Sequence, residues 1–594
     1  MNPTCIVRKA LVAGLLLLSA VAANGQTQPR LDARRGGDGR VELAWTAPGF
    51  RLETAASLLP PVWTAASADG FLTATNGSDI VATDLRPAEV ARFFRLRSVG
   101  STPTDPPVGP SYDIGNPLWT DLYVDPVNGD NENDGRTRST AVRGILTAFR
   151  RLPEGTQTNA TRIRLLPGTY FGAYIEDRRG TQEFPILVEP ADGPGTVSFL
   201  QTAAGDQGSL QFFQCAHVYL QDLRIAVNGG DGLQFERCHH VLVRRMRISS
   251  VRSEGQDETV KVNQSQHVYI EDSDISDAGD NCIDVVGAQW GHIVRCRIHN
   301  SGDWGAYLKG GSAYWRVEGN EIWGCGTGGF TAGQGSGLQF MVPPWIHYEA
   351  YDIKVVNNLI HDCEGAGLGV NGGYNILMAH NTLVRVGQRS HTVEFVFGGR
   401  SCDGGATNDC QPLLTLGGWG TTGDGGNFIP NRNVTFVNNL VYNPVGFTNA
   451  DQFIQFANPA PTPPESNLPA NTRADEGLMV RGNVFWNGVP GFNTGLSDDP
   501  ANACHDGTCT PESVLAGNVF NGAEPRLVNV AAGDFRPAPG SPLLGYAGVA
   551  IADFAWSDAP SVPSVPPGNP SNAVNADLRG TNRIGAAVVG ALLP

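Results

Sequence analysis

The stretch HVYLQDLRIAV (residues 217–227) recurs twice in similar form, as HVLVRRMRISS (240–250) and HVYIEDSDISD (267–277). Each copy places two apolar residues one position apart, a turn residue three positions later, and then a second short apolar run. The copies begin 23 and 27 residues apart. Self-similarity at such a period is typical of a solenoid, in which each repeat contacts only its neighbours.

The repeat continues toward the C-terminus, and its turn position becomes asparagine. The further copies are Gly291-Ile293-Cys296, Trp315-Val317-Asn320, Ile353-Val355-Asn358, Ile376-Met378-Asn381, Val434-Phe436-Asn439, Leu478-Val480-Asn483 and Ser513-Leu515-Asn518. Short apolar–polar alternation in a chain with 74 glycines favours strands and turns over helices. We therefore predict three short strands per coil. The first is a Gly-x-x-x segment such as 232–235, the second is the Val-x-Ile segment, and the third follows the turn position.

The whole sequence predicts five regions. Arg8 and Lys9 precede the apolar run Ala10–Ala23, which indicates a signal peptide over residues 1–25 and a secreted, extracellular or periplasmic protein. Alternating strands and turn residues then predict a small β-sandwich-like accessory module. The expected boundaries are 30–100 for this module, 101–114 for a Pro-rich linker, 115–550 for the solenoid and 551–594 for a tail that packs on it.

Charge and cysteine content limit the partners and the compartment. The formal net charge of −16 argues against nucleic acid as a partner, and the leader's apolar run is too short to span a bilayer. We expect a monomer. Without Cys5 the chain keeps ten cysteines, and Cys402–Cys410 and Cys504–Cys509 bracket short loops that suit local disulfides. Cys215/Cys238 and Cys325/Cys363 hold equivalent places in successive repeats, as disulfides or as stacked thiols.

The asparagine series gives the sequence a specific family resemblance. Asparagine recurs at the turn from Asn320 onward, where its side chain can bond neighbouring backbone groups. Such a ladder resembles that of pectate-lyase-like proteins over residues 115–550. The resemblance implies an all-β, right-handed parallel β-helix. In that family an extended strand and a short helix cap the first coil, as Leu122–Asp125 and the helical pattern Ala141–Leu152 would here.

Two scarce lysines stand out on predicted first strands. The chain has 38 Arg but four Lys, and Lys261 and Lys309 lie two coils apart with Asp284 on the coil between them. Strand alternation directs Lys261 and Asp284 outward. For Lys309 an equal count predicts an inward side chain, whereas the local pattern Ala306–Lys309 predicts an outward one. We prefer the outward reading, with one extra residue within 310–312, because an unpaired buried lysine is very costly.

The turn that leads into these strands is acidic. Asp280 and Asp303 each follow a third-strand isoleucine by five residues and should stack, and Asp277 and Asp284 flank Asp280. Glu254, Asp257 and Glu258 lie one coil earlier. Several carboxylates around one point repel one another unless they share a cation, and oxygen ligands favour calcium. We therefore expect Ca²⁺ as the cofactor, with Asp277, Asp280, Asp284 and Asp303 as ligands.

This grouping resembles family nine pectate lyases and, less closely, chondroitinase-B-type lyases. The resemblance implies calcium-assisted β-elimination in an anionic, uronate-containing polysaccharide, with Lys309 as the base and Lys261 as the second candidate. Aromatic rings suit sugar stacking and arginine suits substrate carboxylates. The candidate substrate-binding residues are Trp304, Tyr307, Arg297, Trp323 and His361.

Three other interpretations remain open. A glycoside hydrolase on the same fold would use paired carboxylates, for example Asp280 and Asp303, instead of lysine. In a non-catalytic glycan-binding or surface protein, the acidic turns would serve only to keep the exposed edge of the solenoid soluble. Lys309 would then be a solvated lysine beside acidic turns, since charge clusters also occur without catalysis.

Overall fold

The computed structural model divides the chain into two units, Met1–Pro106 and Pro107–Pro594, which are described separately. In the first unit it describes the backbone of individual strands. In the second it describes residues 109–200, 209–250, 257–389, 391–402, 412–413, 428–447, 452–461, 472–489, 496, 504–546, 548–555, 568–583 and 588–594.

The first unit contains two antiparallel four-stranded sheets. One has the order β1-β8-β4-β5 and the other β2-β3-β7-β6. The strands are β1 (Cys5–Arg8), β2 (Leu31–Arg35), β3 (Val41–Trp45), β4 (Phe50–Ala55), β5 (Thr64–Ala65), β6 (Phe71–Asn76), β7 (Asp79–Asp84) and β8 (Phe93–Ser98). β1 lies inside the predicted signal peptide, whose other residues fall outside the described part of the chain.

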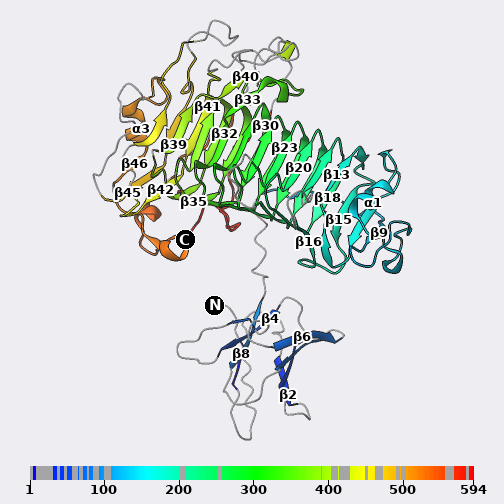
Figure 1. Cartoon of the computed structure of the whole chain (residues 1–594). Helices are drawn as coiled ribbons and strands as arrows, with labels where there is room; N and C mark the ends of the chain where they lie inside the picture. Colours follow the sequence, from blue (N-terminus) through cyan, green and yellow to red (C-terminus); the bar gives the residue numbers. More distant parts are fainter. Residues whose placement is uncertain are drawn as a thin grey trace. The chain divides into compact units, whose positions relative to one another are not determined.

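The second unit is a right-handed parallel β-helix, as predicted, built from three long parallel sheets (Figure 1). We name them by the order of their strands within a coil. The first-strand sheet contains β13 (Ala173–Glu176), β17 (Leu210–Phe213), β20 (Leu233–Glu236), β23 (Val260–Asn263), β26 (Ile283–Val286), β29 (Trp304–Lys309), β32 (Gly328–Gly333), β36 (Leu368–Asn371), β39 (His391–Val396) and β43 (Gln452–Phe456).

The second-strand sheet follows in each coil. It contains β9 (Thr120–Val124), β11 (Thr161–Leu165), β15 (Ile186–Pro190), β18 (Val218–Gln221), β21 (His239–Arg244), β24 (Gln266–Glu271), β27 (Gln289–Val294), β30 (Ser312–Glu318), β34 (Ala350–Val356), β37 (Gly373–Ala379), β41 (Arg432–Val437) and β44 (Met479–Arg481). These strands carry the Val-x-Ile segments of the repeat.

The third-strand sheet closes each coil. It contains β12 (Gly168–Tyr170), β16 (Val197–Leu200), β19 (Arg224–Val227), β22 (Arg247–Ser250), β25 (Asp274–Ser276), β28 (Arg297–His299), β31 (Glu321–Trp323), β35 (Leu359–Cys363), β38 (Thr382–Val386), β42 (Leu440–Asn443), β45 (Val484–Asn487) and β46 (Val519–Phe520). Smaller elements are the pairs β10 (Gly155–Thr156) with β14 (Arg178–Arg179), β33 (Gly335–Gly337) with β40 (Gly399–Ser401), and β47 (Leu527–Asn529) with β48 (Asp534–Pro537), and the helices α1 (Ile145–Arg150) and α3 (Pro511–Gly517).

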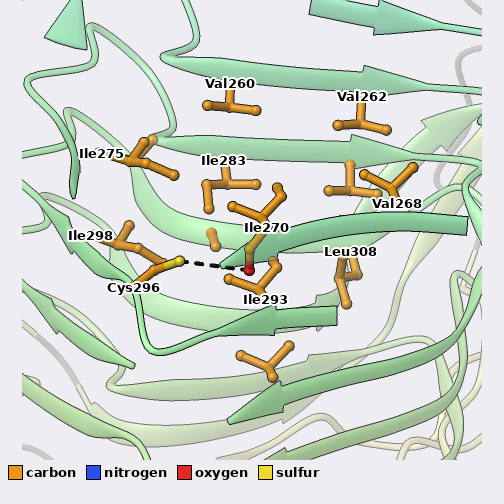
Figure 2. Packing of buried hydrophobic residues seen from close by; sticks show 14 of the residues in the cluster. Val260, Val262, Val268, Ile270, Ile275, Ile283, Ile293, Cys296, Ile298 and Leu308 are labelled. Carbon is orange, nitrogen blue, oxygen red and sulfur yellow. Dashed lines mark hydrogen bonds between the residues drawn. The ribbon is translucent and has the colours of Figure 1, made fainter. Parts of the chain in front are cut away.

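The core lies between the three sheets and is made by the inward half of each alternating strand. On the first-strand sheet Val260 pairs with Ile283, and Ile283 with Ala306, and all three are fully buried. Figure 2 shows aliphatic side chains from strands of all three sheets pointing into one interior, where the Cys296 thiol faces the carbonyl of Ile270. The parallel register places the inward apolar residues of each coil on those of the next, so the buried core is continuous along the solenoid.

The asparagine ladder forms as predicted. Asn320 Nδ2 donates to Asn358 Oδ1 (2.9 Å), and the same bond is repeated between each later pair of the ladder. The later bonds are Asn358 to Asn381 (3.0 Å), Asn381 to Asn439 (3.0 Å), Asn439 to Asn483 (3.0 Å) and Asn483 to Asn518 (2.8 Å). Each buried amide thus satisfies its own polar atoms and those of the next coil.

The last copy of the repeat is not a second strand, contrary to the prediction. Residues 511–517 form α3 because Pro511 occupies its first turn and Thr510 caps it, accepting a hydrogen bond from the Ser513 N–H. The turn position survives nevertheless, since Asn518 Oδ1 accepts from the Asn483 N–H at 2.9 Å.

The flanking segments pack on the solenoid. The boundary of the second unit lies at Pro107, inside the predicted linker, because Tyr112 stacks on Tyr269 with ring centroids 4.3 Å apart. At the other end Lys354 Nζ donates to the carbonyls of Asn569 and Ser571, so residues of the tail lie on the second-strand sheet. Among the described residues, no helix has both the length and the apolar character needed to cross a membrane.

The cysteines divide into bonded and free groups. Cys504 and Cys509 form a disulfide, as predicted. The paired positions Cys215/Cys238 and Cys325/Cys363 are free, buried thiols, which is the stacked-thiol alternative. Cys402 is disulfide-bonded, and Cys410 lies outside the described residues.

Candidate functional site

The candidate site lies on the outward face of the first-strand sheet, where β23, β26 and β29 run side by side. Lys261 pairs with Asp284, and Asp284 pairs with Tyr307, so these three side chains form one outward column. Lys309 lies two residues further along β29, beside Val286. The site therefore spans three successive coils of one sheet.

Lys309 faces outward, as the local alternation predicts. Its neighbours Ala306 and Leu308 are fully buried in the core, whereas Lys309 is half-buried. The extra residue lies after the lysine. The register offset is 23 residues from Val286 to Lys309 and 24 from Gln289 to Ala313. The positive φ angles of Gly310 (66°) and Gly311 (84°) accommodate this longer turn.

Lys261 is held inside a cluster of carboxylates. Its Nζ lies 3.8 Å from Glu258 Oε1 and 3.9 Å from Asp284 Oδ2. Glu258 and Asp284 are only 3% and 4% exposed. Asp231 joins them because its Oδ1 accepts the Glu258 N–H at 3.0 Å. We call Asp231, Glu258, Asp280 and Asp284 the acidic cluster; sequence analysis missed Asp231, which precedes β20 two coils before Asp284.

Three carboxylates of the acidic cluster, those of Asp231, Glu258 and Asp280, resist ionisation. Burial, and then Asp284, raise the pKa of Glu258 to about 9. The pKa values of Asp231 and Asp280 are also raised, in both cases mainly by burial. Burial would lower the pKa of Lys261, but the carboxylates of Asp231, Asp284 and Glu258 outweigh it and raise that pKa. Lys261 is therefore a stable ammonium ion, which cannot accept a proton.

The four predicted calcium ligands do not converge. Asp280 and Asp303 stack as expected, since the Asp303 N–H donates to the Asp280 carbonyl at 2.8 Å. The Asp277 carboxylate accepts hydrogen bonds from Ser276 Oγ (2.8 Å) and Asn300 Nδ2 (3.1 Å). Where the chain is described, no three of the predicted ligands bring carboxylate oxygens within 4.8 Å of one another.

One carboxylate oxygen of the acidic cluster is nevertheless left without a partner. Asp284 Oδ1 is buried and accepts no well-aligned hydrogen bond from the described residues, although the carboxylate interacts with the Tyr307 hydroxyl. An unpaired buried carboxylate oxygen is costly, and oxygen donors suit calcium. Asp284 therefore fits a cation ligand, with Glu258 and Asp280 beside it.

Lys309 has quite different surroundings from Lys261. Its Nζ donates to Gln334 Oε1 at 3.0 Å and lies 4.2 Å from the centroid of the Tyr307 ring. No carboxylate of the described chain lies within 4.0 Å of this nitrogen. Gln334 lies in the insertion after β32. Sequence analysis did not identify it, because the path of an insertion cannot be read from the repeat.

The insertion that carries Gln334 is fixed by a buried ion pair. Glu349 Oε2 accepts from the Gly310 N–H (2.9 Å) and from Ser336 Oγ (2.8 Å). Its other oxygen, Oε1, lies 2.8 Å from Arg400 Nη2, and both of these side chains are fully buried. This ion pair ties the chain after Lys309 to the segment after Gln334, so their relative positions are well defined.

The aromatic residues Trp304 and Tyr307 do not offer sugar-stacking faces, contrary to the prediction. They are 4% and 3% exposed and pack together with Ala366. Trp304 pairs with Gly328 in the neighbouring strand, and a Cβ at that glycine would lie 2.2 Å from the Trp304 ring. The glycine makes room for the ring, which the strand then covers.

The other predicted substrate-binding residues lie on the third-strand sheet. Trp323 stacks between His299 and His361, with ring centroids 4.1 and 5.7 Å away, and the Arg297 guanidinium lies 4.9 Å above it. Arg297 pairs with Asp274 (3.1 Å). Arg297, Trp323 and His361 thus form a group of their own, on a different sheet from Lys261 and Lys309.

A comparison with protein families supports this architecture. A family model described as "Right handed beta helix region" matches residues 231–407. No curated protein matches the sequence.

Three solved structures illustrate the distant matches. A rhamnogalacturonan lyase is 13% identical, with a TM-score of 0.40 over 61% of this chain and 87% of its own. Pectate lyase Pel9A is 14% identical, with a TM-score of 0.35 over 75% and 94% of the two chains. A GH136 lacto-N-biosidase from Eubacterium ramulus is 11% identical, with a TM-score of 0.37 over 68% of each. The coils and the family model identify the second unit as a right-handed parallel β-helix.

Proposed function

We propose that this protein is a secreted polysaccharide lyase that cleaves an anionic, uronate-containing glycan, with Lys309 as the catalytic base. The observation that carries the proposal is the contrast between the two outward lysines. Lys261 Nζ has two carboxylates within 4.0 Å, whereas Lys309 Nζ has an amide oxygen and an aromatic ring. Lys309 is therefore the outward lysine that is not held in direct carboxylate contacts, which leaves its amine available to a substrate.

The reaction assigned to Lys309 is β-elimination. The neutral amine takes the proton from C5 of the uronate, the C5–H electron pair forms the C4=C5 double bond, and the C4–O bond to the leaving sugar breaks. The leaving oxygen is protonated from water, and the Lys309 ammonium later returns its proton to solvent. The Gln334 side chain accepts one N–H of Lys309 and so orients the amine toward the sheet face.

We infer that the acidic cluster holds calcium beside this base. Asp284, with its unpartnered buried oxygen, would be the principal ligand, and Glu258 and Asp280 would complete the set. Bound calcium would supply the positive charge that a uronate carboxylate needs in this acidic surrounding. The protein's own contribution is to hold these oxygens on adjacent strands, within reach of the Lys309 face.

The test is a lyase assay. Purified protein is incubated with a panel of uronans, with and without a chelator, and the unsaturated product is followed by its ultraviolet absorbance. We expect activity that falls at least about 100-fold in Lys309→Ala, the usual contribution of a general base. Arg224→Ala, an exposed arginine of the third-strand sheet, is the matched control and should keep full activity. Full activity in Lys309→Ala would remove this residue from the mechanism.

A glycoside hydrolase is the second candidate, favoured by the pair Asp280 and Asp303. The two residues stack on successive coils, and burial followed by Asp303 raises the pKa of Asp280, as befits a general acid. Release of reducing ends without ultraviolet absorbance, lost in both Asp280→Asn and Asp303→Asn, would establish this function instead of the lyase.

A further inference from the structure

A column of aromatic rings runs along the corner between the first-strand and second-strand sheets. Residues at this corner adopt positive φ, which is 48° at His217, 54° at His240 and 55° at His267. Their rings stack nearly parallel, with centroids 4.4 Å apart for His217 and His240 and 4.2 Å for His240 and His267. The column continues through Trp290 and Tyr314.

His239 stands at right angles to this stack. Its ring stands at 87° to that of His217 and 85° to that of His240, and the residue is exposed at the start of β21. His239 Nδ1 lies 3.2 Å from His240 Nδ1. One nitrogen of each of His217, His239 and His240 lies within 4.8 Å of the other two.

These distances match the needs of a transition metal. Two nitrogens bound at about 2.0–2.1 Å to one tetrahedral zinc ion lie about 3.3 Å apart. The observed 3.2 Å between His239 and His240 is close to this value.

We propose that His217, His239 and His240 form a binding site for a borderline divalent metal such as Zn²⁺, Ni²⁺ or Cu²⁺. Imidazole ligands favour these ions over calcium, so the site is chemically distinct from the acidic cluster. His239 and His240 supply the primary pair of ligands. His217 is the third ligand, and it must turn to bind. Its ring is now nearly parallel to that of His240, and its Nδ1 lies 3.2 Å from Tyr219 Oη.

The experiment is a calorimetric titration of the full chain, made without a polyhistidine tag and stripped of metal, with ZnCl₂ and separately with CaCl₂. We expect one zinc ion per chain. The affinity should fall at least about 10-fold in His239→Gln and His240→Gln, and less in His217→Gln, because each lost primary ligand costs more than the mobile third one. Cobalt(II) absorbance would report nitrogen ligation directly.

Two controls make the result decisive. His267→Gln removes a stacked histidine of the same column that is not one of the three ligands, and it should bind zinc as the unaltered chain does. Asp284→Asn removes the acidic cluster's unpartnered carboxylate and should also leave zinc binding unchanged. Zinc binding that is absent, or unaffected by His239→Gln, would overturn the proposal; thermal melts verify that each variant is folded.

Discussion

Lys309 Nζ donates a 3.0 Å hydrogen bond to Gln334 Oε1, which joins a coil of the solenoid to a segment inserted within the next coil. We predict that Gln334→Ala lowers kcat about 10-fold with little change in KM, because the amide orients the amine rather than binding sugar. Steady-state kinetics on the best uronan will measure the effect. Gln211→Ala, an outward glutamine on β17, is the matched control and should leave both constants unchanged.

The raised pKa of Glu258 predicts how stability depends on pH. Because the folded state holds this pKa at about 9, above the ordinary 4.5, the carboxyl favours folding below about pH 4.5 and loses that contribution progressively up to pH 9. Glu258→Gln, which cannot ionise, should therefore melt about 1–4 °C higher than the unaltered chain at pH 8, and at the same temperature at pH 4. Melts with a chelator present test this; an equal shift at both pH values would contradict it.

The asparagine ladder predicts a large loss of stability for a small substitution. Asn381 is fully buried, and its side chain donates to the Val355 carbonyl (2.9 Å) and to Asn439 Oδ1 (3.0 Å). Asn381→Ala should destabilise the helix by roughly 2–4 kcal/mol, since it leaves groups of adjacent coils unpaired. Thermal unfolding compares it with Asn159→Ala, an exposed asparagine outside the ladder whose loss should have no measurable effect.

The raised pKa of His361, on the third-strand sheet, predicts a contribution to stability that is lost as the pH rises. Burial would lower its pKa, but Asp362 (2.6 Å) and Glu321 (3.5 Å) outweigh this and raise it. Its stabilising contribution is therefore present below about pH 6.5 and is lost as the pH rises through the folded-state pKa. His361→Gln should lower the melting temperature at pH 5.5 more than at pH 9. A shift that does not depend on pH would show that only packing matters there.

The repeat predicts the fold well because solenoid register is encoded locally. Alternation alone directs Lys261 and Asp284 outward, and the turn position correctly locates the ladder from Asn320 onward. The repeat pattern mispredicts residues 511–517, where Thr510 and Pro511 start a helix inside a segment that keeps the apolar spacing of a strand. Local turn chemistry outweighs periodicity in a terminal coil.

The candidate site is predicted only in part, because a linear repeat does not show where insertions run or which side chains the neighbouring coils bury. The neighbours Lys261 and Asp284 follow from counting, but Gln334 reaches Lys309 through an insertion whose path depends on the buried Glu349–Arg400 pair. Burial of Trp304 depends on the glycine at position 328 in the next coil. Contacts between coils, unlike the direction of a side chain, require the structure.

The segment near residues 568–583 closes the side of the solenoid, with consequences for how the protein is made. Arg583 Nη2 donates to Asn357 Oδ1 at 3.0 Å, and Val574 packs with the apolar patch of Val356 and Leu377. Coils can stack one after another as the chain leaves the ribosome, but this apolar flank stays exposed until about 200 further residues have been synthesised. During that interval the nascent chain would be a natural client for chaperones.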